Sequence, residues 1–335
     1  ILVPLAIVVI IYFHQGQGGS FGKDFYTSFL LALIFIEFAL RITGSNPRQF
    51  LDVTKNEVVT NIPDKKLGWI PKEGVHRFKP WSADGKNTNL TVNNDNSRYT
   101  GQISEKKDKI VFLGGSITQG WAVSDDENFP YIIQTKYPNY KVYNYGVGGY
   151  GGYQSLLRLE EIVKEKENIK FVIYGFINHH EERNIATGKW MYILNYFSKR
   201  GLVQVPFASI DKNGQLIKHA PIKYMKLPLS DYSALTAKIE QKLMYLKSFL
   251  RERKLSDVSL RIIKEMKILS EKNGSDFIVV SLETFQDERD KKYEIFFDKF
   301  KIKNIKCLLP IGKKYIVIGD GHPNELSHNI LANCI

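Results

Sequence analysis

Residues Lys109–Gly120 read KIVFLGGSITQG, a short apolar run followed by two glycines and a serine. A run of this length that stops at glycines is typical of a buried strand in a parallel sheet. The glycines let the chain turn tightly, so we predict Ser116 at the N-terminus of the next helix. There its own N–H and the helix dipole would face a developing negative charge.

The alternation of apolar runs and helical patterns continues to the C-terminus. We predict further strands at Tyr140–Tyr145, Lys170–Phe176, Asp276–Leu282 and Tyr315–Ile318, with helices between them. Repeated strand–helix units with short connections specify a parallel sheet covered by helices on both faces. We therefore expect an α/β domain over residues 109–335 with a parallel five-stranded sheet. In such sheets, ligands bind at the carboxyl ends of the strands.

Polar residues and glycines follow these predicted strands. Ser116 follows the first, a glycine-rich loop (Gly146–Gly152) the second, Asn178 the third, and the pair Asp320 and His322 the last. Each signal alone is weak, because Gly-Gly-Ser is usually a turn and Asp-Gly-His usually a loop. Their order at the strand ends favours acyl transfer, which needs a nucleophile, a base, an orienting acid and oxyanion donors.

Four sequence blocks carry a family resemblance. VFLGGSITQG, VYNYGVGGYGG, FVIYGFIN and GDGHPN occur in this order between Val111 and Asn324. The chain from Lys109 to its C-terminus thereby resembles the SGNH (GDSL) hydrolase superfamily, in the bacterial group with an N-terminal anchor. The resemblance implies a flavodoxin-like three-layer α/β/α sandwich that needs neither a metal nor a cofactor.

The resemblance also implies roles for individual residues. Ser116 would be the nucleophile, His322 its base and Asp320 the partner of the base. The N–H groups of Ser116 and Gly149 and the side-chain amide of Asn178 would form the oxyanion hole. The implied activity is cleavage of an acyl ester, on a saccharide or a lipid, through an acyl-enzyme on Ser116. Acyl transfer to a sugar hydroxyl is the first alternative, and a non-catalytic envelope binding protein on the same fold is the second.

Three positions depart from the family pattern. Gly115 stands where an aspartate usually precedes the serine, and His179 where an aspartate usually follows the asparagine, with the preceding glycine displaced to Gly175. Asp320 lies two residues before His322 instead of the usual three. The last departure leaves open a serine–histidine dyad in which Asp320 only caps the closing helix.

Two other motifs suggest different functions. Gly146–Gly151 fits GxGxxG, but the next predicted strand ends without the acid that a dinucleotide site requires. The run His179–Glu182 could hold a metal, but adjacent side chains point apart, so polar loop residues at the site mouth are favoured. His328 is predicted to be structural or exposed in the closing helix. We therefore expect no cofactor and no metal.

The N-terminal region is apolar. Ile1–Phe13 is too short alone to span a bilayer, whereas Phe25–Ile42 is near the lower limit of length. Glu37 and Arg41 lie four residues apart and can pair on one helix face. We expect residues 1–44 to be a membrane anchor of one or two segments, with the catalytic domain outside the cytoplasm. The alternatives are a buried helix or a signal-peptide core. Because the chain opens at Ile1, we expect a fragment or a processed product.

Two other regions flank or interrupt the catalytic pattern. Residues 45–108 are predicted to form a linker and a small β-rich lead-in. Residues 179–254 are predicted to be an insertion with a hairpin at Asn213-Gly214 and a following helix. An insertion at this place either borders the substrate site or is structural only.

Composition sets broad limits on partners. The chain has 335 residues, 43% of them hydrophobic, and a formal net charge of +12, which suits one or two globular units. Its lysines are scattered among acids and no nucleic-acid motif occurs, so no nucleic-acid partner is expected. Cys307 and Cys334 could form one disulfide or stay as thiols. Nothing in the sequence indicates an oligomeric state.

Overall fold

The computed structural model describes residues 20–48, 60–80, 86–101, 108–197, 203–283 and 285–335. The first apolar segment predicted at residues 1–13 lies outside these ranges, as does most of the glycine-rich turn after it. The second apolar segment is helical and belongs to α2 (Ser20–Ile42).

The central sheet contains the five strands β5 (Lys109–Gly114), β6 (Lys141–Gly146), β7 (Ile169–Phe176), β10 (Asp276–Ser281) and β11 (Lys303–Lys306). They are parallel and lie in the order β6-β5-β7-β10-β11. Counted along the chain, this is the order 2-1-3-4-5, which is that of the flavodoxin-like doubly wound fold. The predicted fold class is confirmed.

The predicted fifth strand was placed wrongly. Tyr315–Ile318 contains the end of a 3-10 turn (η2, Lys313–Tyr315) and one isolated bridge between Ile316 and Pro323. The fifth strand is β11, whose sequence Lys-Asn-Ile-Lys is partly exposed at the edge of the sheet. An edge strand needs little apolar content, so no apolar run marks β11 in the sequence.

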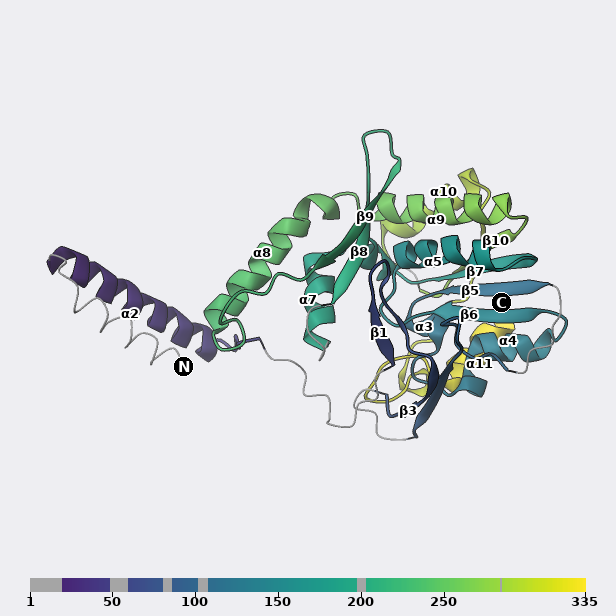
Figure 1. Ribbon diagram of the computed structural model, residues 1–335, viewed down its shortest axis with the longest axis horizontal. Coiled ribbons are helices and arrows are strands. Elements are labelled where there is room, and N and C mark those ends of the chain that lie inside the picture. Colours follow the sequence, from purple (N-terminus) through teal and green to yellow (C-terminus); the bar gives the residue numbers. More distant parts are fainter. Residues whose placement is uncertain (1–19, 49–59, 81–85, 102–107, 198–202, 284) are drawn as a thin grey trace.

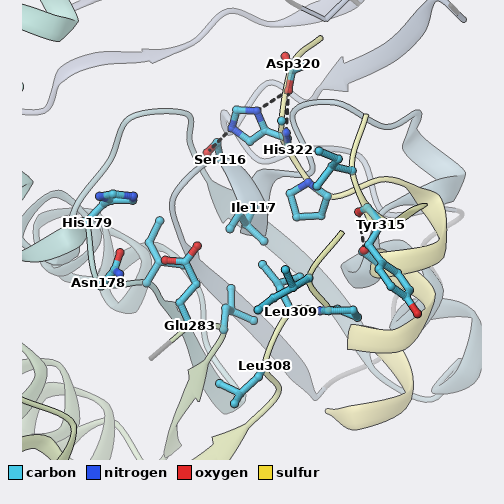
Figure 2. Close-up of a pocket in the computed structure, with 18 of the residues that line it drawn as sticks. Ser116, Ile117, Asn178, His179, Glu283, Leu308, Leu309, Tyr315, Asp320 and His322 are labelled. Carbon is cyan, nitrogen blue, oxygen red and sulfur yellow. Dashed lines mark hydrogen bonds and ion pairs between the residues drawn. The ribbon is translucent and has the colours of Figure 1, made fainter. Parts of the chain in front are cut away.

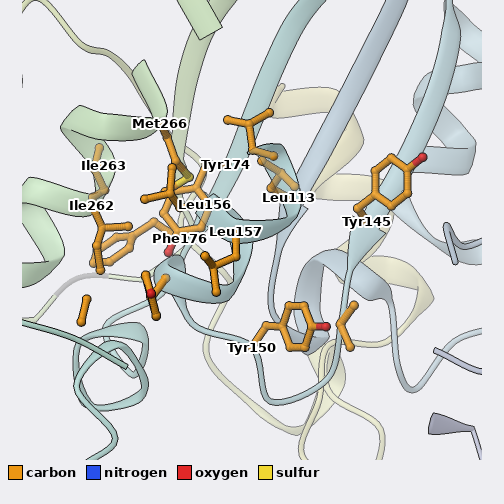
Figure 3. Packing of buried hydrophobic residues seen from close by; sticks show 14 of the residues in the cluster. Leu113, Tyr145, Tyr150, Leu156, Leu157, Tyr174, Phe176, Ile262, Ile263 and Met266 are labelled. Carbon is orange, nitrogen blue, oxygen red and sulfur yellow. The ribbon is translucent and has the colours of Figure 1, made fainter. Parts of the chain in front are cut away.

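Helices cover both faces of the sheet (Figure 1). On one face, α5 (Gly152–Glu165), α9 (Leu255–Lys272) and α10 (Glu288–Lys299) pack on alternate strand residues such as Val111 and Leu113. Figure 3 shows this core, with Tyr174 and Leu113 near Leu156 and Met266. On the other face, α4 (Phe129–Lys136) and α11 (Glu325–Cys334) pack on the intervening residues, such as Ile110 and Phe112.

The region before β5 forms short antiparallel pairs. β1 (Asn61–Asp64) pairs with β2 (Gly68–Pro71), and β3 (Gly74–Phe78) pairs with β4 (Thr88–Val92). Trp69 connects this lead-in to the main domain, because its indole N–H donates a hydrogen bond to Gly148 O at 3.0 Å.

The insertion after Asn178 contains the predicted hairpin and helix. Two short helices, α6 (His180–Asn184) and α7 (Gly188–Phe197), come first. The strands β8 (Gln204–Ile210) and β9 (Leu216–Lys223) then flank Asn213-Gly214. α8 (Ala234–Glu252) follows; it begins at the C-terminal end of α2, which projects from the body of the molecule (Figure 1).

Candidate active site

Glycines lie at the ends of β5 and β6 and one residue before the end of β7, beneath the helix that begins at Ser116. Gly114 pairs in register with Gly146 on one side and Gly175 on the other. The short helix α3 (Ser116–Gln119) lies directly on them. A Cβ at Gly114 or Gly175 would lie within 2.4 Å of the Thr118 hydroxyl, and one at Gly146 within 2.4 Å of Gln119 N. Side chains are thus excluded at all three glycines, which lets Ser116 lie close to the sheet.

A buried arginine from the lead-in holds the end of this helix. Arg98 donates to Gln119 O at 2.7 Å, Gly120 O at 2.5 Å and Val123 O at 2.7 Å, and it pairs with Asp125 at 3.0 Å. Its burial lowers the pKa of the guanidinium from its usual value. No motif marks Arg98 in the sequence, since the carbonyl groups that it binds at the end of α3 and in the loop after it lie more than twenty residues away.

Ser116, His322 and Asp320 form a continuous chain of hydrogen bonds (Figure 2). His322 Nε2 lies 2.9 Å from Ser116 Oγ, and His322 Nδ1 lies 2.5 Å from Asp320 Oδ1. The side chain of Asp320 is fully shielded from solvent, whereas that of His322 is 22% exposed. A proton on Nδ1 shared with the carboxylate leaves Nε2 to accept the serine hydroxyl.

The two-residue spacing from Asp320 to His322 is accommodated by a turn. Asp320 Oδ1 also accepts the backbone N–H of His322 at 3.1 Å, and Gly321 adopts φ +90°. Asn324, not Asp320, caps α11, because its side chain accepts Ser327 N. The alternative role of Asp320 as the cap of the closing helix is therefore wrong.

A disulfide closes the segment that carries this turn. Cys307, just after β11, is bonded to Cys334 at the end of α11, with Cα atoms 5.8 Å apart. Of the two states left open by the sequence, the structure has the paired one.

Gly115 faces two cationic or titratable side chains of α6. A Cβ at Gly115 would lie 2.9 Å from His180 Nε2 and 3.1 Å from Arg183 Nη1. His180 is fully buried and its Nδ1 is 2.7 Å from the Tyr174 hydroxyl. The space that an aspartate side chain would need before the serine is therefore occupied by His180 and Arg183.

The electrostatics of these two groups differ. Burial, with the nearby Arg183 charge, holds the pKa of His180 well below its usual value, so this histidine is neutral. Burial lowers the pKa of Arg183 to about 10, which leaves it cationic at neutral pH. Arg183 donates to Tyr150 O at 3.0 Å and its guanidinium lies 4.7 Å from the centre of the Trp190 ring.

A cavity of about 680 Å³ opens at Ser116 and His322. Figure 2 shows Asn178, His179 and Glu283 on one side of it, Tyr315 on the other, and Ile117 and Leu309 between. Of the described residues of the insertion (179–197 and 203–254), His179 and Arg183 alone line the cavity, and the hairpin at Asn213-Gly214 does not.

The three residues expected to form the oxyanion hole differ in their position relative to the cavity. Ser116 begins α3, and Asn178 lines the cavity with an Oδ1 atom that has no partner among the described residues. Gly149 has φ +82° beside Trp69 and is not among the cavity-lining residues. Its neighbour Gly148 is tied to the Ser116 helix, because Gly148 N donates to Gln119 Oε1 at 2.9 Å.

The GxGxxG pattern has a packing explanation. Gly146 lies against Thr118 and Gln119, and a Cβ at Gly151 would lie within 2.8 Å of Arg183 and Asn184. These glycines thus serve close contacts around the serine helix.

The prediction of polar loop at the site mouth for His179–Glu182 holds for His179 alone, which lines the cavity; His180, Glu181 and Glu182 lie in α6 and do not. His180 and Glu181 are buried, and Glu181 accepts the Tyr293 hydroxyl at 2.9 Å and Arg289 at 3.0 Å. Among the described residues, no group of three potential metal ligands occurs.

His328 is structural. It is buried, stacks on Phe129 and accepts Phe129 N at 3.3 Å. Burial lowers the pKa of His328 to about 3.

Comparison with known proteins gives structural matches. No protein-family model and no curated protein matches the chain. A member of the lipolytic protein G-D-S-L family from Veillonella parvula is 13% identical, with 67% of this chain and 94% of that chain covered and a TM-score of 0.39. The psychrotrophic esterase EstA from Pseudoalteromonas sp. is 10% identical, with 68% and 93% covered and a TM-score of 0.36. A carbohydrate esterase is 11% identical, with 79% and 86% covered and a TM-score of 0.38. At these values the likeness assigns no activity to this chain.

Proposed function

We propose that this chain is a serine esterase of the SGNH (GDSL) type that works through an acyl-enzyme on Ser116. The observation that carries the proposal is the hydrogen-bond chain from Ser116 Oγ to His322 Nε2 and from Nδ1 to the shielded Asp320 carboxylate. A serine hydroxyl is a poor nucleophile at neutral pH unless a base removes its proton during attack. The distances of 2.9 and 2.5 Å suit that transfer.

In the first step, Ser116 Oγ attacks the ester carbonyl carbon and its proton moves to His322 Nε2. The Asp320 carboxylate stabilises the resulting imidazolium. Collapse of the tetrahedral intermediate breaks the bond to the alcohol, which takes the proton from Nε2. Water then attacks the acyl-enzyme with His322 again as the base, and the acid is released.

The developing oxyanion needs donors that are in place before the reaction. We assign them to the N–H groups of Ser116 and Gly149 and the amide of Asn178, as the family resemblance implies. The Asn178 side chain lines the cavity, and the Arg183 cation beside Gly115 adds a field that favours negative charge there.

The substrate is proposed to be an acyl ester whose acyl part contacts Ile117, Ile177 and Leu309. These apolar side chains line the cavity next to the serine, while Asn178, His179 and Glu283 are polar. A saccharide or a lipid headgroup would suit the polar side.

We further propose that α2 anchors the protein in a membrane and that the esterase domain lies outside the cytoplasm. Phe25–Ile42 is long and apolar enough to span, with a mean hydropathy of 1.8, and only 6% of it is buried in the protein. The Cys307–Cys334 disulfide supports an oxidising compartment. Thiol alkylation of the protein in intact cells, with and without prior reduction, tests the second point.

The esterase proposal is tested by fluorophosphonate labelling and by turnover of acyl esters. We expect the label on Ser116, and we expect Ser116→Ala to lower kcat by about 10⁴-fold or more. Ser209→Ala is a matched control, because Ser209 also contacts a histidine, His219, at 2.7 Å. Labelling of Ser209, or turnover by Ser116→Ala within tenfold of the wild type, would remove Ser116 from this role. Addition of saccharide acceptors then separates transfer from hydrolysis.

A further inference from the structure

We propose that α8 is an interfacial helix whose apolar face lies on an anionic phospholipid surface beside the α2 anchor. This rests on the membrane anchor proposed above and not on the esterase assignment. Six large apolar side chains of α8 are exposed within twelve residues: Ile239, Leu243, Tyr245, Leu246, Phe249 and Leu250. On α9, α10 and α11 such residues occur singly, as Ile268, Ile295 and Leu326. A concentration of this kind marks an interaction surface.

The exposed side chains form a stripe on one side of the helix. Ile239, Leu243, Leu246 and Leu250 follow one another at spacings of four, three and four, which places them on one face. The opposite face carries Glu240, Met244 and Ser248, all buried.

The buried face of α8 is fastened to the rest of the protein. Glu240 pairs with Arg48 at 3.2 Å, and both side chains are almost fully shielded. The hydroxyl of Ser248 accepts Gly188 N of α7 at 2.9 Å. Near the C-terminal end, Arg251 donates to Ile185 O and Ala186 O, each at 3.0 Å. The helix therefore cannot turn its apolar stripe inward without breaking these contacts.

The N-terminus of α8 is joined to the end of the proposed membrane span. The Glu37 carboxylate of α2 accepts the Ser233 hydroxyl and the N–H groups of Ala234 and Leu235, each at 2.9 Å. Arg41 bonds the same carboxylate at 2.7 Å and donates to Tyr232 O at 2.8 Å. Figure 1 shows α8 leaving this junction across the direction of α2 and not along it. A helix in that position lies along a membrane surface when α2 crosses the membrane.

The charges of α8 fit an anionic surface. Lys238, Lys242 and Lys247 are exposed beside the stripe, and Arg253 and Lys254 follow at its end. Within residues 234–254, which are all described, both acids point inward: Glu240 is buried, and Glu252 accepts the Ser248 hydroxyl. An apolar stripe flanked by lysines is the pattern of helices that lie in the headgroup region, about 5–10 Å into the headgroup and acyl boundary.

The proposal is tested on the full chain in liposomes with a fluorescent thiol label at single introduced cysteines. The chain has two cysteines and both are in the disulfide, so an introduced cysteine is the only free thiol. Leu246→Cys reports on α8, Phe35→Cys on α2, and Ile295→Cys on α10 is the matched control, since all three residues are exposed and apolar. Quenching is measured with phospholipids that carry a spin label near the headgroup or deep in the acyl chain.

We expect the label at Leu246 to be quenched most by the shallow spin label, that at Phe35 by the deep one, and that at Ile295 by neither. Phosphatidylglycerol in phosphatidylcholine vesicles should raise the shallow quenching at Leu246. Reversing Lys238, Lys242 and Lys247 to Glu should abolish that gain, whereas the same change at Lys291, Lys299 and Lys303 should not.

Four results would overturn the proposal, and they distinguish its failure from failure of the membrane anchor. Quenching at Leu246 as low as at Ile295, with Phe35 quenched, overturns the interfacial helix and leaves the anchor in place. A Leu246 label that is shielded from water but not quenched by lipid means that a protein covers the stripe, which also overturns the proposal. Equal quenching at Leu246 with and without phosphatidylglycerol would overturn the proposed preference of α8 for an anionic surface. If neither Phe35 nor Leu246 is quenched, both the anchor and the interfacial helix are wrong.

Discussion

Removing the disulfide between Cys307 and Cys334 should lower stability strongly while leaving the catalytic geometry almost intact. The bond joins positions 27 residues apart, and the closed segment contains Asp320 and His322. Loop-closure entropy for a loop of this length gives about 3.5 kcal/mol at 25 °C. For a domain of this size, that corresponds to a fall in Tm of about 7–14 °C.

Activity should respond less, because the turn that carries the base is held by its own contacts. Val317 N donates to His322 O at 2.9 Å, and Asn324 N donates to Tyr315 O at 3.1 Å. The Ser327 hydroxyl also donates to Tyr315 O, at 2.6 Å. These bonds do not depend on the cross-link, so kcat at 25 °C should stay within about tenfold of the wild type, a change of less than about 1.4 kcal/mol in the barrier.

The assay compares the wild type with Cys307→Ala/Cys334→Ala by thermal unfolding and ester turnover. Reduced wild type is the second sample, because it keeps both side chains and lacks only the bond. A Tm unchanged in both samples would refute the entropic estimate. A collapse of kcat at an unchanged Tm would show that the bond positions His322, contrary to the reasoning from the turn.

Three further predictions concern the surroundings of the site. Arg98→Ala should lower the free energy of unfolding by about 3 kcal/mol, because it leaves buried carbonyl groups without donors. It should also slow fluorophosphonate labelling of Ser116, and Arg98→Lys should have intermediate effects on both. Gly115→Ala should reduce kcat because the added methyl group crowds His180. Adding His180→Ala to the same chain should recover part of that loss, and a double variant whose loss in kcat equals the two single losses combined would contradict the contact. The folded pKa of His328, about 3, lies below its unfolded value of 6.5, so its burial stabilises the protein above pH 6.5 and this contribution is lost as pH falls from 6.5 toward 3. His328→Phe should flatten unfolding free energy against pH in that window, and an unchanged slope would assign the acid sensitivity elsewhere.

The sequence predicted the parts of the site that depend on local pattern. Four of the five strands (β5, β6, β7 and β10) are apolar runs. Ser116, Asn178, Asp320 and His322 all line the cavity beyond the ends of the strands. The edge strand Lys303–Lys306 escaped prediction because exposure at an edge removes the apolar signal. The placement of these four residues at one cavity therefore follows from the rule that polar groups gather at the carboxyl ends of parallel strands, even though one strand was misplaced.

The contacts that fix the site come from distant positions and carry no local signal. Arg98 reaches the carbonyls of the serine helix from a lead-in strand region, and Glu37 reaches the N-terminus of α8 across 196 residues or more. A buried arginine and a capping glutamate look like ordinary polar residues in sequence. Their roles follow from tertiary packing, which a single chain does not reveal.

The site can be understood as two rigid units that meet at one hydrogen bond. The nucleophile unit is fixed by the glycine strand ends and by Arg98. The base unit is a turn in which Asp320 Oδ1 accepts both the backbone N–H and the imidazole Nδ1 of His322, so acid and base are oriented by the same oxygen. The two-residue spacing from Asp320 to His322 therefore suffices, because the carboxylate reaches the imidazole without a longer turn between them. Ser116 and His322 are 206 positions apart, and the chain between them can accept the insertion and its α8 without disturbing the chemistry.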